Sequence, residues 1–329
     1  MKEKASGCFK YGCIGCLSIL ALLVGLMLLA GAVQLASDHD PTPEQREASH
    51  ELPPAPFPNA PIYDEGEVPL DPESPPVSVS LTPEAPEGPS GRVVLDIAMA
   101  DLTIRPGPAD QPIRLESDFD TSAFELNEEL SSDDDGNWTY TVSFGARGGF
   151  LGLLLKGGGD AGRLELIVPR GRPIEIVGEI GMGKSETDLG GLWVTQVDLE
   201  LGMGDHFLEV REPMPFPMQS FRVESSAGNF EVHSLGEASP ARIEVNHRMG
   251  ELYLDLEGTW RNDADVDVAF GMGACRMWLP KGARVDIDQA RVSMGERSLD
   301  LPDQDNLPED APTLTLHLEG SMGELRIDS

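Results

Sequence analysis

The chain has 329 residues, of which 57 are acidic and 24 basic, so its formal net charge is -33. Nucleic-acid binding relies on Lys and Arg that neutralise phosphates, and this charge balance therefore excludes a nucleic-acid partner. The same charge disfavours adhesion of a folded part to an anionic lipid surface.

An apolar stretch without a charged residue runs from Ile14 to Ala36. Its length matches a helix that spans a bilayer, so we predict a transmembrane helix over residues 13–36. The small residues at 30–32 also fit a signal-peptidase site, which would release the rest of the chain. The length of the apolar stretch favours the uncleaved anchor.

Charged residues on either side of this stretch set its orientation. Three lysines precede it and two aspartates follow it: Lys2, Lys4, Lys10, Asp38 and Asp40. The positive-inside rule then places residues 1–12 in the cytoplasm and the C-terminal part outside, in a single-pass protein of the cell (inner) membrane.

The cysteines fall into two groups. Cys8, Cys13 and Cys16 lie at the cytoplasmic edge of the apolar stretch, where we expect them to be ordinary small apolar residues. Palmitoylation and metal ligation are the alternatives. Cys275 stands alone on the outer side, so we predict no disulfide there.

Residues 37–90 have the composition of a linker. They contain 14 of the 27 prolines and a single basic residue, Arg46. Proline-rich segments favour extended polyproline II conformers, and no periodic apolar face is present to bury. We therefore predict a disordered, acidic tether that holds a domain over residues 91–329 away from the membrane.

A tripeptide centred on Met and ending in Gly recurs through that domain every 21 to 28 residues, a period typical of stacked or solenoid folds. The members are Gly181-Met182-Gly183, Gly202-Met203-Gly204, Arg248-Met249-Gly250, Gly271-Met272-Gly273, Ser293-Met294-Gly295 and Ser321-Met322-Gly323, with Ala227-Gly228 filling the one gap. Apolar and polar residues alternate before each glycine, as they do in strands. Further strands are predicted at 92–104, 139–144 and 163–168, with a polar turn at 133–137.

The parity of the apolar residues changes at each glycine. Leu252 follows Met249 by three places instead of two, and Cys275 follows Met272 in the same way. A one-residue slip would turn every later side chain to the wrong face, so the glycine must form a bulge or a corner. The alternation before the corner places the methionines inward, and we predict an interior column of core methionines, with a copper(I) site formed by their thioethers as the alternative.

These patterns predict an all-β fold, a β-solenoid-like stack of about seven strand–corner–strand repeats of about 22 residues, preceded by one transmembrane helix. No stretch of the domain keeps a 3.6-residue period long enough for a helix. The outward positions collect carboxylates and predict a solvated acidic face, with calcium binding as the alternative. They are Glu175, Glu179, Asp198, Glu200, Glu224, Glu244, Asp265 and Asp267.

The motifs of the domain do not point to a reaction. Residues 178–185 match the phosphate-loop pattern G-x-x-x-x-G-K-[ST], but no helix is predicted after Lys184 and the same corner recurs without lysine, so we expect no nucleotide. The inward His206, His247 and Cys275 are expected to be core residues, and Trp278 is expected on the outside. We assign no catalytic, cofactor-binding or metal-binding residue, because no nucleophile with a base and no paired acid and base were found.

The stretch Asp96–Pro106, the segment Arg163–Ile176 and the serial corners resemble the adhesin-like, toastrack-type envelope domains of bacteria. Those families carry Gly-Ser-Gly-Asp at each corner, and here Met replaces Ser. The resemblance covers residues 91–329 and implies a β-solenoid-like scaffold, often attached to membrane helices and associated with envelope sensing or adhesion.

The sequence therefore predicts a membrane-anchored extracytoplasmic binding or scaffolding domain, with an envelope glycan or protein as partner and no enzymatic activity. The alternative is a polysaccharide-active enzyme that uses acidic residues on the same architecture.

Overall fold

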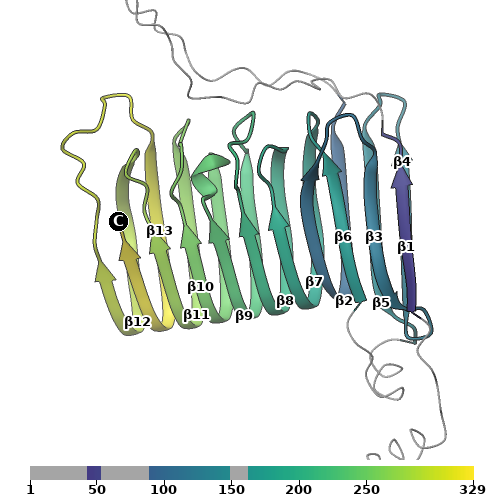
Figure 1. The fold of residues 1–329 in the computed structure, drawn as a ribbon. Helices are drawn as coiled ribbons and strands as arrows, with labels where there is room; N and C mark the ends of the chain where they lie inside the picture. The colour runs from purple at the N-terminus through teal and green to yellow at the C-terminus, as the bar shows by residue number, and fades with distance from the viewer. Residues whose placement is uncertain (1–42, 53–88, 149–161) are drawn as a thin grey trace, which may run out of the picture.

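The computed structural model describes residues 43–52, 89–148 and 162–329 of the chain. In this part, 13 strands form one mostly parallel sheet in the order β1-β3-β6-β2-β7-β8-β9-β10-β11-β13-β12, and the pair β5-β4 also joins β2 (Figure 1). The sole helical element of these residues is a 3-10 turn, η1 (Leu235–Glu237). The all-β prediction is confirmed.

Eight long strands of 14 to 17 residues carry the repeat, and each contains one corner. They are β2 (Gly91–Gly107), β7 (Pro173–Asp188), β8 (Trp193–Glu209), β9 (Ser220–His233), β10 (Arg242–Asp255), β11 (Ala264–Trp278), β12 (Arg284–Leu299) and β13 (Thr313–Asp328). Neighbouring long strands are parallel, and the corner residues pair in register from strand to strand. Each repeat is therefore one bent strand, and β2 adds a corner at Met99 that the sequence pattern did not include.

In the seven corners from β7 to β13 the bend ends at a glycine, whereas β2 has Ala100 at that position. Gly273 has φ +136°, and a Cβ at this position would lie 1.8 Å from the carbonyl oxygen of Gly250 in the neighbouring strand. Gly250 has φ +124°, and a Cβ at this position would lie 1.9 Å from the carbonyl oxygen of Gly228. Residues with a side chain rarely adopt this backbone conformation, and a Cβ would clash with the neighbouring strand. The predicted corner is therefore confirmed at both positions.

The bent sheet has two layers with the core between them (Figure 1). Five shorter strands complete it: β1 (Pro43–His50), β3 (Ile113–Asp120), β4 (Phe124–Ser132), β5 (Trp138–Ala146) and β6 (Gly162–Pro169). Beyond β2 the layers separate, because β5 pairs with the first half of β2 and β6 with its second half. Phe144 of β5 meets Phe119 of β3 edge to face, with ring centroids 5.2 Å apart, so the two layers still pack against each other there.

Strand β1 lies within the predicted linker and corrects that prediction. It pairs antiparallel with β3 over its whole length, from Pro43 opposite Asp120 to His50 opposite Ile113. Leu52, just after it, is buried in the core. The prediction of a disordered linker over residues 37–90 is thus wrong for 43–52, because backbone pairing to a sheet edge needs no apolar pattern of its own. The remaining linker residues before Pro89 lie outside the described part.

The opposite end of the sheet is formed by β12, because β13 inserts between β11 and β12. The side-chain amide of Gln304 covers part of this edge, since its Oε1 accepts from the Val285 amide at 3.3 Å and its Nε2 donates to the Val285 carbonyl at 3.0 Å. The Arg297 guanidinium donates to the Ala290 carbonyl on the same strand. Two side chains thus occupy backbone groups of the edge strand.

Five corner methionines, on β8, β10, β11, β12 and β13, face outward, and the prediction of an interior methionine column is wrong. Met203 is 63% exposed, and Leu201 and His206 on either side of it are buried. Those two positions fill the inner space of the bend, whereas the residue between them lies at its apex, where the alternation of an unbent strand no longer applies. Met249, Met272, Met294 and Met322 are likewise between 41 and 59% exposed.

The predicted cytoplasmic residues 1–12 and transmembrane helix 13–36 fall outside the described residues. Among those that are described, no helix has the length and apolar character needed to cross a membrane.

Candidate functional site

Three aromatic side chains form a strip on the outer face of the second layer. Phe207 lies on β8, His233 ends β9 and Tyr253 lies on β10. The His233 ring centroid is 4.9 Å from that of Phe207 and 4.8 Å from that of Tyr253, at interplanar angles of 37° and 28°. We call these three residues the aromatic strip.

Local sequence explains why the strip faces outward. Phe207 lies between the buried His206 and Leu208, and Tyr253 lies between the buried Leu252 and Leu254. Successive side chains of a strand point to opposite faces, so burial of the flanking residues turns both rings outward. Both rings come four places after a corner methionine, and the shared register aligns them across β9. The strip is therefore a product of the repeat.

Two open hollows adjoin Phe207. One, of about 310 Å³, lies over β7, β8 and β9 and is bordered by Lys184, Ser185, Glu186, Asp205, His206, Asn229 and Glu231. The other, of about 610 Å³, lies over β2, β7 and β8 and is bordered by Thr103, Ile104, Arg105, Pro106, Glu186, Thr187, Asp188, Glu209 and Arg211. A flat ring thus stands between two depressions that are rich in carboxylate oxygens.

Two carboxylates beside the strip have a side-chain partner. Arg211 pairs with Glu209 and lies 3.8 Å from Asp188, and the hydrogen bond to Glu209 is the main reason that the pKa of Arg211 is raised. Glu231 lies 3.4 Å from the Nε2 of His233. The pKa of Tyr253 is raised chiefly by desolvation, so its hydroxyl stays protonated and can donate or accept.

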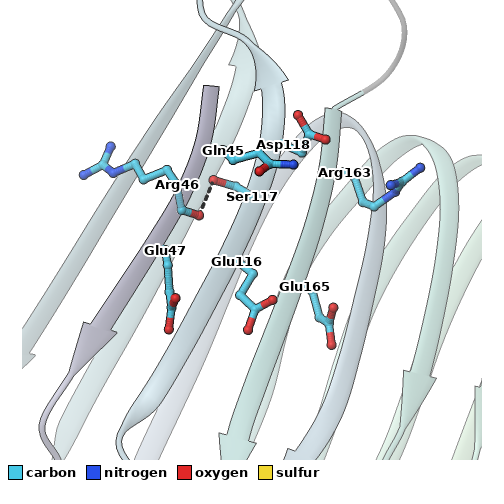
Figure 2. Close-up of a pocket in the computed structure, with 8 residues that line it drawn as sticks. All are labelled: Gln45, Arg46, Glu47, Glu116, Ser117, Asp118, Arg163 and Glu165. Atoms are coloured by element: carbon cyan, nitrogen blue, oxygen red, sulfur yellow. Dashed lines mark hydrogen bonds between the residues drawn. The ribbon is translucent and has the colours of Figure 1, made fainter. Parts of the chain in front are cut away.

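A further hollow of about 430 Å³ lies where β1, β3 and β6 run side by side (Figure 2). Glu47, Glu116 and Glu165 form a row across these strands, in register. Arg114 lies 3.7 Å from Glu47 and 3.3 Å from Glu116. Arg105 pairs with Glu165. All three carboxylates therefore have a guanidinium partner.

Figure 2 also shows how β1 is fastened at this hollow. The hydroxyl of Ser117 donates to the carbonyl oxygen of Arg46 at 3.2 Å, while the Arg46 and Arg163 side chains point away from each other (Figure 2). The hollow thus arises because β1, which lies in the predicted linker, pairs with the edge of the sheet.

The remaining sequence-predicted positions are distributed over the fold. The phosphate-loop match at 178–185 lies inside β7, and no helix begins after Lys184. His206, His247 and Cys275 are buried as predicted. Trp278 is half-buried at the end of β11, and the predicted outward carboxylates are half or fully exposed. Within the described residues, no group of three His, Cys, Asp or Glu side chains is arranged to hold a metal ion.

Desolvation shifts the pKa values of three buried side chains. His206 Nδ1 lies 2.9 Å from the Ser185 hydroxyl, and burial lowers the pKa of His206 and of His247. Burial raises the pKa of Cys275 to about 12, so its thiol stays protonated and unreactive. His247 and Cys275 belong to the core, and Ser185 and His206 are buried beneath the smaller hollow beside Phe207.

Sequence reasoning missed the aromatic strip, although a signal was present. Phe207 and Tyr253 occur at the same distance after Met203 and Met249. His233 does not share this spacing, because it lies six places after the corner residue Ala227 and not four. Only the register between β8, β9 and β10 brings it beside both rings.

Comparison with known proteins gave two solved structures, while no protein-family model and no curated protein matched the chain. One is a candidate cell adhesion protein from Clostridium sporogenes, with 13% identity, a TM-score of 0.39, and coverage of 87% of this chain and 99% of that one. The other is a candidate adhesin from Parabacteroides merdae, with 9% identity, a TM-score of 0.24, and coverage of 86% and 96%.

Proposed function

We propose that the protein is an adhesin-like binding module of the cell envelope, in which the aromatic strip binds an extended glycan. In this proposal the segment 13–36 anchors the chain in the membrane and the sheet lies on the extracytoplasmic side. The observation that carries the proposal is the strip itself, three aromatic side chains of which Phe207 adjoins two carboxylate-lined hollows.

The chemistry of the strip suits a sugar. A ring face offers a flat apolar surface for the C–H face of a sugar, and neighbouring carboxylates accept hydrogen bonds from its hydroxyls. Phe207 and Tyr253 are two strands apart, about 10 Å at the usual strand spacing, so one extended molecule can contact both. Glu186, Glu209 and Glu231 provide the acceptors in the hollows.

The charge of the chain narrows the choice of glycan. With a net charge of -33, the protein repels an acidic polymer, whereas a neutral or cationic glycan meets no such repulsion. A carboxylate-lined surface also favours amino sugars, whose ammonium groups pair with Glu and Asp. We therefore expect a neutral or amino-substituted envelope polysaccharide.

The test is retention of envelope polysaccharide by the immobilised full-length protein, followed by size analysis of the bound and released glycan. Intact polymer should be retained by the wild type and lost with Phe207→Ala plus Tyr253→Ala. The control is Leu301→Ala, which removes an exposed apolar side chain elsewhere and should retain the polymer. Equal retention by the double variant and the wild type would reject the strip as the site.

The same experiment distinguishes a binding module from the alternative, a polysaccharide-active enzyme. Release of shortened glycan that stops when Glu209 or Glu231 is replaced by Gln would show hydrolysis by carboxylates and overturn the binding module. Retention of the polymer without any change in its length supports binding.

A further inference from the structure

A row of thioethers follows the convex ridge of the sheet, on a different surface from the aromatic strip. Met99, Met182 and Met203 are paired in register on β2, β7 and β8. Met249, Met272, Met322 and Met294 are paired in the same way on β10, β11, β13 and β12. Between the two groups, Ala227 of β9 pairs with Met203. We call these seven methionines the methionine row.

The fold does not require methionine at these places. Strand β9 forms the same corner with Ala227, and its Gly228 has φ +112° like the other corner glycines. Met203, Met249 and Met294 are each more than half exposed, so they contribute little to the core. Met182 is half-buried, and Met99, at the β2 end of the row, is partly buried against the core. Exposing a long apolar side chain at one corner after another carries a cost in water, and a structural role does not explain it.

The spacing of the row suits convergence of several sulfur atoms on one ion. Adjacent strands lie about 4.8 Å apart, and each methionine has three rotatable side-chain bonds with which its sulfur can move toward its neighbours. Thioethers are soft ligands that select soft monovalent cations. Three neighbours form one cluster before Ala227 and four form another after it.

Carboxylates border the row on both sides. Glu179, Glu200 and Glu224 are aligned three places before the corner residue, on adjacent strands. Asp205 and Glu251 lie two places after it, and Asn229 between them donates to Asp205 at 3.1 Å. Their negative potential concentrates cations over the sulfur atoms.

We propose that the methionine row binds soft monovalent d10 cations, Cu(I) or Ag(I), through thioether sulfur. The four-methionine cluster formed by Met249, Met272, Met322 and Met294 is one site, and the cluster formed by Met99, Met182 and Met203 is the other. The carboxylates attract the ion, while sulfur supplies the bonds.

The test uses Ag(I), which needs no reductant, in chloride-free buffer with the full-length protein. Cys8, Cys13 and Cys16 are replaced by Ser in every sample, because thiolates bind the same ions. The methionine methyl groups carry ¹³C. Addition of Ag(I) should shift the methyl resonances of the row and leave those of the buried Met214, Met218 and Met277 unchanged.

A matched variant assigns the ligands. Met249→Leu, Met272→Leu and Met322→Leu together keep the apolar volume and remove three sulfur atoms, so the fold should persist. Silver retained after gel filtration should fall by about half, because one of two clusters is lost. Ala227→Met, which fills the gap in the row, should raise it.

Acidity gives an independent readout. Thioethers do not take up protons, so silver retention should be equal at pH 7 and pH 5, whereas His, Cys and carboxylate sites lose metal on protonation. Silver that stays bound in the triple Leu variant, or that binds without shifting any methionine methyl, would overturn the proposal. So would the absence of retained silver.

Discussion

At the residue scale, Gly273 occupies a position that no side chain can share. Its φ of +136° and the 1.8 Å approach of a Cβ to the Gly250 carbonyl both oppose substitution. Gly273→Ala should lower the free energy of unfolding by more than about 2 kcal/mol, through backbone strain and displacement of the neighbouring strand. Urea unfolding of the purified protein measures this.

Gly282 provides the matched control, since no atom lies within 4 Å of a Cβ built there. Gly282→Ala should change the stability by no more than about 0.5 kcal/mol. Equal effects of the two substitutions would mean that the corners tolerate ordinary residues.

The buried histidines make stability depend on pH. Burial lowers the pKa of His247 below the ordinary histidine value of about 6.5, so below that pH the unfolded chain binds a proton that the folded chain does not. The contribution of His247 is complete above pH 6.5 and is lost as the pH falls, at a slope of at most about 1.4 kcal/mol per pH unit.

His247→Leu should therefore flatten the fall in stability between pH 7 and pH 5. Leucine fits the position, because Leu201 occupies the same row on β8. Urea unfolding at several pH values gives the slope. A slope identical to that of the wild type would show that His247 titrates alike in the folded and unfolded states.

At the element scale, the edge strand β12 is protected by a side chain that imitates a neighbouring strand. Gln304 makes one donor and one acceptor bond to Val285. Gln304→Ala should cost about 1 kcal/mol or more, because two backbone groups lose their partner. It should also promote association through the uncovered edge, measurable as concentration-dependent elution in gel filtration.

Asn306→Ala in the same loop is the control, because Asn306 is exposed and should leave both stability and elution unchanged. If Gln304→Ala behaves like Asn306→Ala, the contacts to Val285 do not protect the edge.

Strand β1 is an element that the sequence pattern does not predict. Its residues, PEQREASH, have no alternation of apolar and polar side chains, so composition indicated a linker. The strand forms because β3 offers an edge for backbone pairing, and that edge exists only once the sheet is folded. By contrast, 92–104, 139–144 and 163–168 carry their own alternation, and the structure confirms them as strands.

At the scale of the whole molecule, the corner glycines could be predicted and the face of the corner residue could not. The parity change between Met249 and Leu252 already required a bend, and Leu252 is buried as expected. Parity does not say which residue lies at the apex, so the alternation predicts that Met249 is inside, whereas it is 52% exposed. The aromatic strip depended in turn on the register of three strands, which no single repeat contains.

The most direct test of this account is the order in which the methionines oxidise when the folded protein is treated with dilute peroxide and followed by mass spectrometry. An in-register sheet bent at its glycines predicts rapid sulfoxide formation at Met203, Met249 and Met294, and slow formation at the buried Met214 and Met277. Protection of the corner methionines equal to that of Met277 would place them in the core and contradict the bent sheet, the ridge and the site proposed on it.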